Sequence, residues 1–181
     1  MDNIEFAPFG KIARLSRDVV ISEKIDGTNG IIYVNESEDD ILVGSRRRWI
    51  TPEDDNYGFA KWAYAHKDEL LSLGHGFNYG EWWGSGIQRK YGLKEKRFSL
   101  FNSFRWSDDN VRPACCGVVP VLYSGLFSTI EIGTVLYNLQ HGGSIAAPGF
   151  MKPEGVVIYH TAARKYFKKT IENDEKPKGA K

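Results

Sequence analysis

A lysine followed by an acid and a glycine is the feature of this sequence best suited to covalent chemistry. It lies in the segment Glu23-Lys24-Ile25-Asp26-Gly27-Thr28-Asn29-Gly30, where Lys24 ends a strand-like run and the glycines indicate a turn. A lysine amine attacks only when it is unprotonated, and burial or a second cation favours that form. The segment alone fits a surface lysine beside a β-turn equally well, so its chemistry depends on other residues.

Two further segments carry groups that can bind phosphate and sugar. Gly44-Ser45-Arg46-Arg47-Arg48 places three guanidinium groups after an apolar run, and such groups bind phosphate oxygens through paired hydrogen bonds. Tyr79-Gly80-Glu81-Trp82-Trp83-Gly84 places one carboxylate within an apolar strand, where it needs partners such as ribose hydroxyls or a cation. The ordinary alternatives are a solvated basic patch and a structural salt bridge.

Three later segments add aromatic, acidic and basic groups. Phe98-Ser99-Leu100-Phe101 supplies rings that could stack on a base, although core packing is more usual. Pro153-Glu154-Gly155-Val156 opens a strand with a carboxylate, which could hold a hydrated Mg²⁺. The cluster Arg164-Lys165-Tyr166-Phe167-Lys168-Lys169 follows, and its lysines could neutralise a phosphate.

Hydrophobic periodicity predicts the elements that position these residues. Apolar or aromatic runs predict strands over residues 19–24, 31–34, 41–43, 77–83, 98–106, 118–123 and 156–159. Helical spacing predicts helices over residues 56–73, with His66 packed on the apolar side, and over residues 128–140, opened by Ser128 and Glu131 as a capping box. Many short strands and two helices, without regular alternation, favour an α+β fold with mainly antiparallel sheets flanked by helices.

Composition favours a single soluble domain. The chain has 181 residues, 41% of them hydrophobic and 26% charged, and a net charge of +1, so attraction to nucleic acid must come from a local patch. The neighbouring Cys115 and Cys116 offer neither a disulfide framework nor a metal-ligand spacing, which predicts a reducing, cytoplasmic setting. We find no secretory signal and no apolar run of roughly 20 residues, so no membrane association is expected.

In this order, the segments resemble the covalent nucleotidyltransferase superfamily of ATP-dependent ligases and mRNA capping enzymes. Lys24-Ile25-Asp26-Gly27 matches the signature Lys-x-Asp-Gly, whose lysine becomes joined to the nucleotide. The resemblance extends from about Lys11 to Lys169. It implies a ligase-type nucleotidyltransferase domain over residues 1–171, with the nucleotide pocket between sheets and helices. A polar tail over residues 172–181 and no OB-fold domain are expected to follow.

The resemblance also implies a role for each candidate residue. The expected catalytic residues are Lys24, Glu154 and Lys168, with Glu154 also the ligand of Mg²⁺ or Mn²⁺. The residues expected to bind ATP are Glu23, Ile25, Asp26, Arg46, Glu81, Phe101 and Lys168. The last motif usually has two lysines one residue apart. Here Lys168 shares a strand face with Tyr166 and Lys169 with Phe167, so we favour Lys168 over Lys165 and Lys169.

Asn29 points to RNA, because RNA ligases resembling this chain have asparagine where DNA ligases have arginine. The prediction is an ATP-dependent RNA ligase that forms lysyl-AMP, transfers AMP to a 5′-phosphate and joins it to a 3′-hydroxyl. Asn29, Arg47 and Arg48 would contact the RNA, and a partner subunit is a further source of binding surface.

Two alternatives differ in substrate or in chemistry. A DNA ligase or a capping-type enzyme would use the same lysine chemistry. A non-catalytic nucleotide- or RNA-binding domain would be expected to lack Lys24 or Glu154, and both are present. The residues do not distinguish ATP from GTP. They also leave open whether the RNA is a nicked duplex, a single strand or a broken tRNA.

Overall fold

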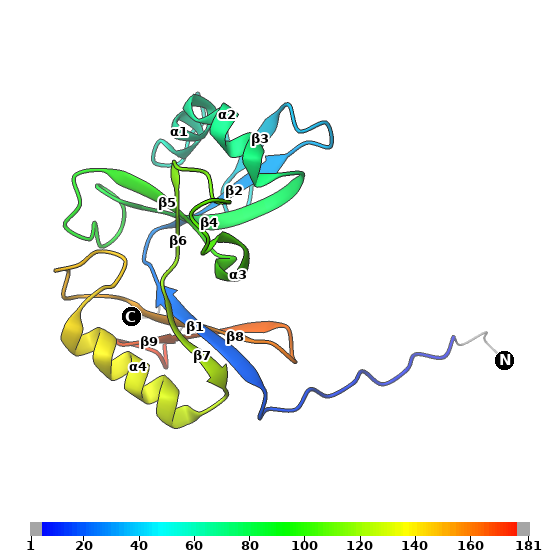
Figure 1. Ribbon diagram of the computed structural model, residues 1–181, viewed down its shortest axis with the longest axis vertical. Coiled ribbons are helices and arrows are strands. Elements are labelled where there is room, and N and C mark those ends of the chain that lie inside the picture. Colours follow the sequence, from blue (N-terminus) through cyan, green and yellow to red (C-terminus); the bar gives the residue numbers. More distant parts are fainter. Residues whose placement is uncertain (1–4, 177–181) are drawn as a thin grey trace.

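Two β-sheets, each covered by helices on one face, make up the computed structural model, which describes residues 5–176 (Figure 1). The first sheet has the order β7-β1-β8-β9, with bounds Val121–Leu126, Asp18–Lys24, Gly155–His160 and Lys165–Thr170. The second has the order β3-β2-β4-β5-β6, with bounds Ile41–Gly44, Thr28–Val34, Gly76–Gly84, Lys96–Leu100 and Cys116–Val118. Only β5 and β6 pair in parallel among the described strands, which confirms the predicted α+β fold.

The helices α1 (Phe59–Ala65) and α2 (Lys67–Leu70) lie at one end of the molecule and α4 (Thr129–Gly142) lies at the other (Figure 1). α1, α2 and the short 3₁₀ helix η1 (Leu71–Leu73) cover the second sheet, so the predicted helix over residues 56–73 is interrupted at His66. α4 covers the first sheet. The hydroxyl of Ser128 accepts the backbone N–H of Glu131 at 3.3 Å, as the capping pattern predicts. No helix within residues 5–176 has the length and apolar character to cross a bilayer.

Two predicted strands are wrong in part. The strand predicted over residues 98–106 ends at Leu100, and α3 (Ser103–Trp106) follows, capped by Asn102, whose side chain accepts the N–H of Arg105 at 3.2 Å. The strand predicted over residues 118–123 is divided between the sheets at Pro120, which has no N–H to donate to a ladder.

The packed part of the chain begins at β1. Residues 5–14 form neither helix nor strand and run away from the sheets (Figure 1). Residues 1–4 of the predicted domain and 177–181 of the predicted tail lie outside the described residues. The domain boundaries therefore stay a prediction.

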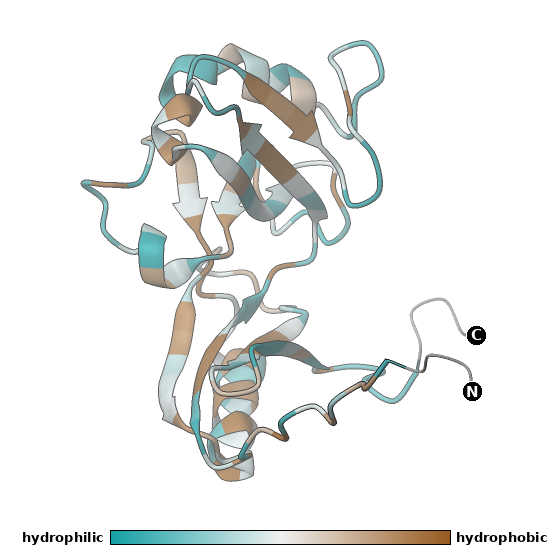
Figure 2. Ribbon diagram, turned by 90° about the vertical axis from the view of Figure 1, so that its right-hand side faces the viewer, coloured by the Kyte–Doolittle hydropathy of each residue, from teal (hydrophilic) through white to brown (hydrophobic). Residues whose placement is uncertain are grey.

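Three groups of buried apolar residues hold these elements together. One lies between the second sheet and α1, and another between the first sheet and α4. Figure 2 shows hydrophobic stretches along the strands of both sheets. The third group lies where the sheets meet and consists of Ile25, Trp83, Tyr91, Val119 and Ala147.

The chain crosses from one sheet to the other twice, at residues 25–27 and 119–120. The two crossings are adjacent, because the N–H of Glu23 donates to the carbonyl of Pro120 at 2.9 Å. Ile25 and Val119 also share the third apolar group. Lys24 therefore lies where β1 leaves the first sheet.

Two facing glycines make room for the aromatic core of the second sheet. Gly30 in β2 pairs with Gly80 in β4. A Cβ atom at Gly30 would lie 2.6 Å from the ring of Phe59 and 2.8 Å from that of Phe98. Both rings are fully buried, so neither can move away without disturbing the core.

We expect Gly30→Ala to destabilise the protein by about 1–3 kcal/mol, because the added methyl group overpacks this core. Gly133→Ala is the matched control, since a Cβ at this position of α4 meets no atom within 4 Å. It should be neutral or stabilise by about 0.5–1 kcal/mol, because alanine favours helix over glycine. Denaturant unfolding of both variants measures this, and equal effects would contradict the packing argument.

Candidate active site

Lys24 and Glu154 form an ion pair at the end of β1. The Nζ atom of Lys24 lies 2.6 Å from Oε2 of Glu154, with the side chains 21% and 11% exposed. The two residues are 130 positions apart in sequence. They meet because Lys24 pairs with Gly155 across β1 and β8, which places Glu154 at the same end of the sheet. The backbone carbonyl of Glu154 accepts the N–H of Ile171 at 2.9 Å, which fixes its position.

Asp26 is held by two residues that the sequence did not single out. Arg89 donates from Nε to Oδ2 of Asp26 at 3.1 Å and from Nη1 to the carbonyl of Lys152 at 2.9 Å. The backbone N–H of Asp26 donates to the hydroxyl of Tyr91 at 2.8 Å. Arg89 thereby links the turn after Lys24 to the segment before Glu154.

The loop that carries Arg89 and Tyr91 has unusual backbone angles. Gln88, Lys90 and Tyr91 have φ values of 42°, 61° and 50°, in the left-handed region that side chains disfavour. Three such residues within four positions are costly and persist only where surrounding contacts fix them. The contacts to Asp26 and Lys152 supply that fixation, and no sequence pattern that we recognise would have indicated it.

Glu81 lies inside the site and is almost fully buried. Its carboxylate accepts the backbone N–H of Gly27 at 3.0 Å and the Nδ2 group of Asn29 at 3.4 Å. Burial raises the pKa of Glu81 to about 7, although the positive charge of Lys24 and the N–H of Gly27 oppose the shift. Asn29, predicted to contact RNA, orients Glu81 in this structure.

Strand register places Glu81 and Phe101 on one face of the second sheet. Glu81 pairs with Asn29 on one side and with Ser99 on the other. The N–H of Phe101 donates to the carbonyl of Tyr79 at 2.9 Å, so Phe101 lies two positions from Ser99 on the same face. Its ring is 38% exposed and therefore accessible to a ligand.

Glu23 and Ile25 point away from this face. Glu23 is 1% exposed and accepts the hydroxyl of Ser144 at 2.5 Å and the N–H groups of Ile145 and Ala146 at 2.8 and 2.9 Å. Ile25 is 4% exposed within the third apolar group. Because both side chains are buried, neither can contact ATP directly in this structure. They can affect ATP binding only through their backbone groups or by fixing the position of Lys24.

The register also separates the lysines of β9. Lys168 pairs with Val157, which pairs with Ser22 two residues before Lys24, so Lys168 and Lys24 share a face of the first sheet. With one strand between them and an offset of two residues along the strands, their Cα atoms lie roughly 12 Å apart. Lys169 lies on the α4 face and donates to Asp174 at 3.3 Å.

The three arginines after β3 lie on the surface. Arg48 forms a two-point ion pair with Asp54. Arg46 and Arg47 are exposed and make no ion pair with any residue within 5–176. Arg46 therefore does not join the Lys24 cluster in this structure.

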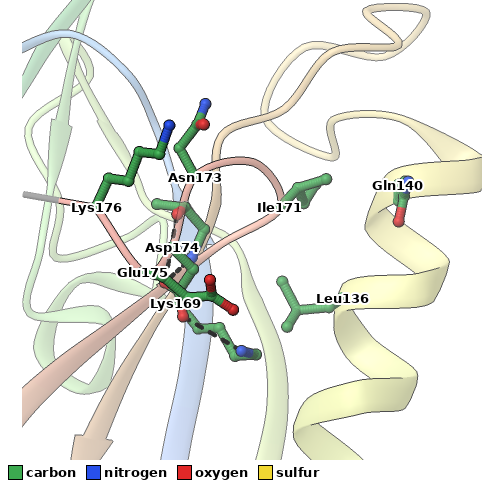
Figure 3. Close-up of a pocket in the computed structure, with 9 residues that line it drawn as sticks. Leu136, Gln140, Lys169, Ile171, Asn173, Asp174, Glu175 and Lys176 are labelled. Carbon is green, nitrogen blue, oxygen red and sulfur yellow. Dashed lines mark hydrogen bonds and ion pairs between the residues drawn. The ribbon is translucent and has the colours of Figure 1, made fainter. Parts of the chain in front are cut away.

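Two shallow hollows lie on the described surface. One of about 490 Å³ lies between α4 and the segment after β9, on the sheet face opposite Lys24 and Lys168 (Figure 3). The other, of about 320 Å³, borders the site through Trp83 and Ser99. Its lining includes Ala146. The backbone N–H of Ala146 donates to the carboxylate of Glu23, so Glu23 helps to fix one wall of this second hollow.

A divalent cation fits the site only in part-hydrated form. No group of three or more histidine, cysteine or acidic residues that could hold a metal occurs within residues 5–176. Glu154 offers one carboxylate, while Asp26 is paired with Arg89. Mg²⁺ commonly binds through one or two carboxylates together with water and substrate phosphates, which this arrangement permits.

Comparison with known proteins assigns the family. Residues 17–171 match the family described as RNA ligase. The chain belongs to the RNA ligase family. A comparison with curated proteins gave no match.

Solved structures of the Naegleria gruberi RNA ligase have the same fold. A mutant of that ligase with ATP and manganese superposes with a TM-score of 0.63 at 23% identity, over 86% of this chain and 49% of that one. A second such mutant gives a TM-score of 0.65 at 22% identity, over 87% and 51%. A third, with AMP and manganese, gives 0.63 at 22% identity, over 86% and 50%. This chain thus spans about half the length of these ligases, and the comparisons give no support to the DNA-ligase or capping alternative.

The raised pKa of Glu81 predicts a pH-dependent stability. Between pH 4.5 and about 7 the unfolded carboxyl loses its proton while the folded one keeps it, so this group's contribution to stability falls as pH rises. Glu81→Gln carries no such titration. Without ATP and in EDTA, its stability relative to the unsubstituted protein should therefore increase by up to about 3 kcal/mol from pH 4.5 to 7.5.

Denaturant titrations at a series of pH values measure this difference. Glu36→Gln, at an exposed acid, should show no comparable trend. A stability difference for Glu81→Gln that stays constant with pH would mean that the pKa of Glu81 is the same in the folded and unfolded protein, and would contradict the raised pKa.

Proposed function

We propose that this protein is an ATP-dependent RNA ligase that works through a lysyl-AMP intermediate on Lys24. The observation that carries the proposal is the Lys24–Glu154 pair at the sheet crossing, in a chain of the RNA ligase family. The presence of both residues in contact argues against a non-catalytic binding domain. The site lacks any other lysine paired with a buried acid among the described residues.

The proposed reaction has three displacements at phosphorus. The Nζ atom of Lys24 attacks the α-phosphorus of ATP, a P–N bond forms and pyrophosphate leaves. The 5′-phosphate of RNA then attacks the lysyl-AMP phosphorus, which frees Lys24 and gives a 5′-adenylylated end. A 3′-hydroxyl attacks that 5′-phosphorus, AMP leaves and the strand is joined. Positioning and charge neutralisation carry most of the catalysis in such displacements.

The nucleotide would be bound by residues from both sheets. Glu81 would accept the ribose hydroxyls and Phe101 would stack on the base, since the two share one face of the second sheet and Phe101 is exposed on it. Lys168 would approach the α-phosphate from the face of the first sheet that it shares with Lys24. Arg46 would reach the phosphates only by moving from its exposed position.

Glu154 would hold Mg²⁺ or Mn²⁺ together with the phosphates of ATP, and the cation would neutralise charge on their oxygens. Engagement of Glu154 in this way would free the Lys24 amine from its present partner. Asp26 is already paired with Arg89, so its proposed part is to hold the turn after Lys24.

The proposed function also includes the ends of the RNA, a partner and a cellular location. We propose RNA with a 5′-phosphate and a 3′-hydroxyl, from the family and from Asn29. A partner subunit would supply further RNA-binding surface beside the exposed Arg46 and Arg47. The cytoplasmic location rests on Cys115 and Cys116, which are both free thiols.

Lys24→Arg should abolish covalent labelling by α-labelled ATP, because arginine keeps the charge opposite Glu154 but forms no stable phosphoramidate. Lys61→Ala, at an exposed lysine of α1, should label normally. The measurement is acid-labile label on a denaturing gel, with α-labelled GTP run in parallel.

Retention of label by Lys24→Arg would place the adduct on another residue. Normal labelling of the unsubstituted protein, without joining of any RNA, would favour a required partner subunit. Preferential joining at a DNA 3′-hydroxyl would favour the DNA-ligase alternative.

Lys168→Ala should slow lysyl-AMP formation by about a hundredfold, the usual effect of removing one group that stabilises transition-state charge. Lys169→Ala is the matched neighbour and should change the rate little, because it loses only a partly exposed pair with Asp174. Single-turnover adenylylation measures both rates. The reverse order of effects would move the role to Lys169 and contradict the register argument.

A further inference from the structure

The sheet face that carries Glu81 continues away from Lys24 as a surface of aromatic side chains. Strand register places alternate residues of β2 and β4 on this face: Asn29, Ile31 and Tyr33 opposite Glu81, Tyr79 and Phe77. Phe77 is 54% exposed and Tyr79 51% exposed. The acidic part of the face thus lies next to Lys24, and the aromatic part lies farther along the same strands.

Trp49 extends the aromatic surface across β3. A Cβ atom at Gly44 would lie 3.2 Å from the indole of Trp49, so the absence of a side chain at Gly44 lets the ring lie against the sheet. Trp49 is 49% exposed. Its ring lies 6.2 Å from that of Phe77 at an angle of 19°, and the rings of Phe77 and Tyr79 lie 6.0 Å apart at 12°. Together with Tyr33, which lies 4.8 Å from Phe77, these residues form what we call the aromatic face.

The exposure of these rings sets them apart from the core. On the opposite side of the same sheet, Phe59 and Phe98 are fully buried. Trp49, Phe77 and Tyr79, by contrast, each keep about half of their surface exposed among the described residues. Contiguous exposed aromatic surface of this kind is typical of a binding site.

The charge beside the aromatic face fits an anionic polymer. Arg46 and Arg47 lie three and two positions before Trp49, are exposed and form no ion pair within residues 5–176, whereas the intervening Arg48 is paired with Asp54. Flat rings beside free guanidinium groups match a strand of unpaired nucleotides, whose bases stack and whose phosphates bind arginine. A duplex fits less well, because its base faces are covered by neighbouring base pairs.

We propose that the aromatic face binds unpaired bases of a single-stranded RNA substrate, with Arg47 on the phosphate backbone. The proposal rests on the proposed function in taking RNA as the substrate. The aromatic face is continuous with Glu81 and Phe101 through Tyr79, so a strand bound there leads toward Lys24.

The test measures the affinity of the protein for a labelled single-stranded RNA of twelve nucleotides, by fluorescence anisotropy in the absence of ATP. The double variant Trp49→Ala/Phe77→Ala should bind at least about tenfold more weakly, because one base stacked on an aromatic ring contributes that much or more. Phe77→Leu keeps apolar surface without the ring and should also weaken binding. Tyr137→Ala, at an exposed ring of α4, should bind as the unsubstituted protein does.

Two further measurements separate stacking from charge. An oligonucleotide of equal length without bases should bind the unsubstituted protein weakly. Its affinity for the double variant should be the same, because it has no bases to stack on the missing rings. Arg47→Ala should lower the slope of log affinity against log salt by about 0.7, whereas the double variant should leave the slope unchanged. Thermal melting of each variant shows whether it is folded, and Trp49→Phe should restore most of the binding lost in Trp49→Ala.

The proposal would be overturned if the folded double variant, or Phe77→Leu, bound the RNA as tightly as the unsubstituted protein does. A lack of RNA binding by the unsubstituted protein would also overturn it. Lysyl-AMP formation, measured separately without RNA, reports on the proposed function alone. A protein that binds RNA through these rings but never forms lysyl-AMP would contradict the ligase proposal and leave the aromatic face supported.

Discussion

The close passage of the chain between the two sheets at Gly27 is the constraint on which the site depends. A Cβ atom at this position would lie 2.4 Å from the carbonyl oxygen of Trp82 and 2.8 Å from Cβ of Trp83. Only glycine lets β1 lead into β2 so close to β4. The same approach brings the N–H of Gly27 to the carboxylate of Glu81, and it leaves Lys24 at the junction, where groups from both sheets converge.

Each of the four acids around this junction has a different partner, and the partner indicates its task. Backbone N–H groups and a serine hydroxyl satisfy Glu23, and Arg89 satisfies Asp26. Glu81 accepts one backbone N–H and one side-chain amide in a setting where burial favours its protonated form. Glu154 alone is paired with Lys24, the proposed nucleophile. Three of the acids are therefore held by groups other than Lys24, and in the proposed reaction a ligand that engages Glu154 would release the Lys24 amine.

The sequence predicted the strands around the site well, because alternating apolar residues with glycine at the turns distinguish a strand from a helix. It failed after Leu100 and at Pro120, where aromatic and β-branched runs continue although the chain turns into a helix or changes sheet. The candidate residues came from contiguous segments, each visible by itself. Arg89 and Tyr91 were missed because their contacts to Asp26 span 63 and 65 positions. The side chain of Glu23 is buried because it contacts Ser144, 121 positions away in sequence, and no local sequence pattern indicates such a contact.

The period of two in β4 joins the candidate site at Glu81 to the aromatic face. Successive residues of this strand alternate between the core under α1 and the face toward the site, so Phe77, Tyr79 and Glu81 follow one another on a single line. A slip of one residue would turn all three into the core and would bring Asn78 and Trp82 out. The facing glycines Gly30 and Gly80 oppose such a slip, because only they leave room for the rings of Phe59 and Phe98 beneath the sheet. The packing on the hidden side of the sheet thus sets which groups meet a ligand on the other side.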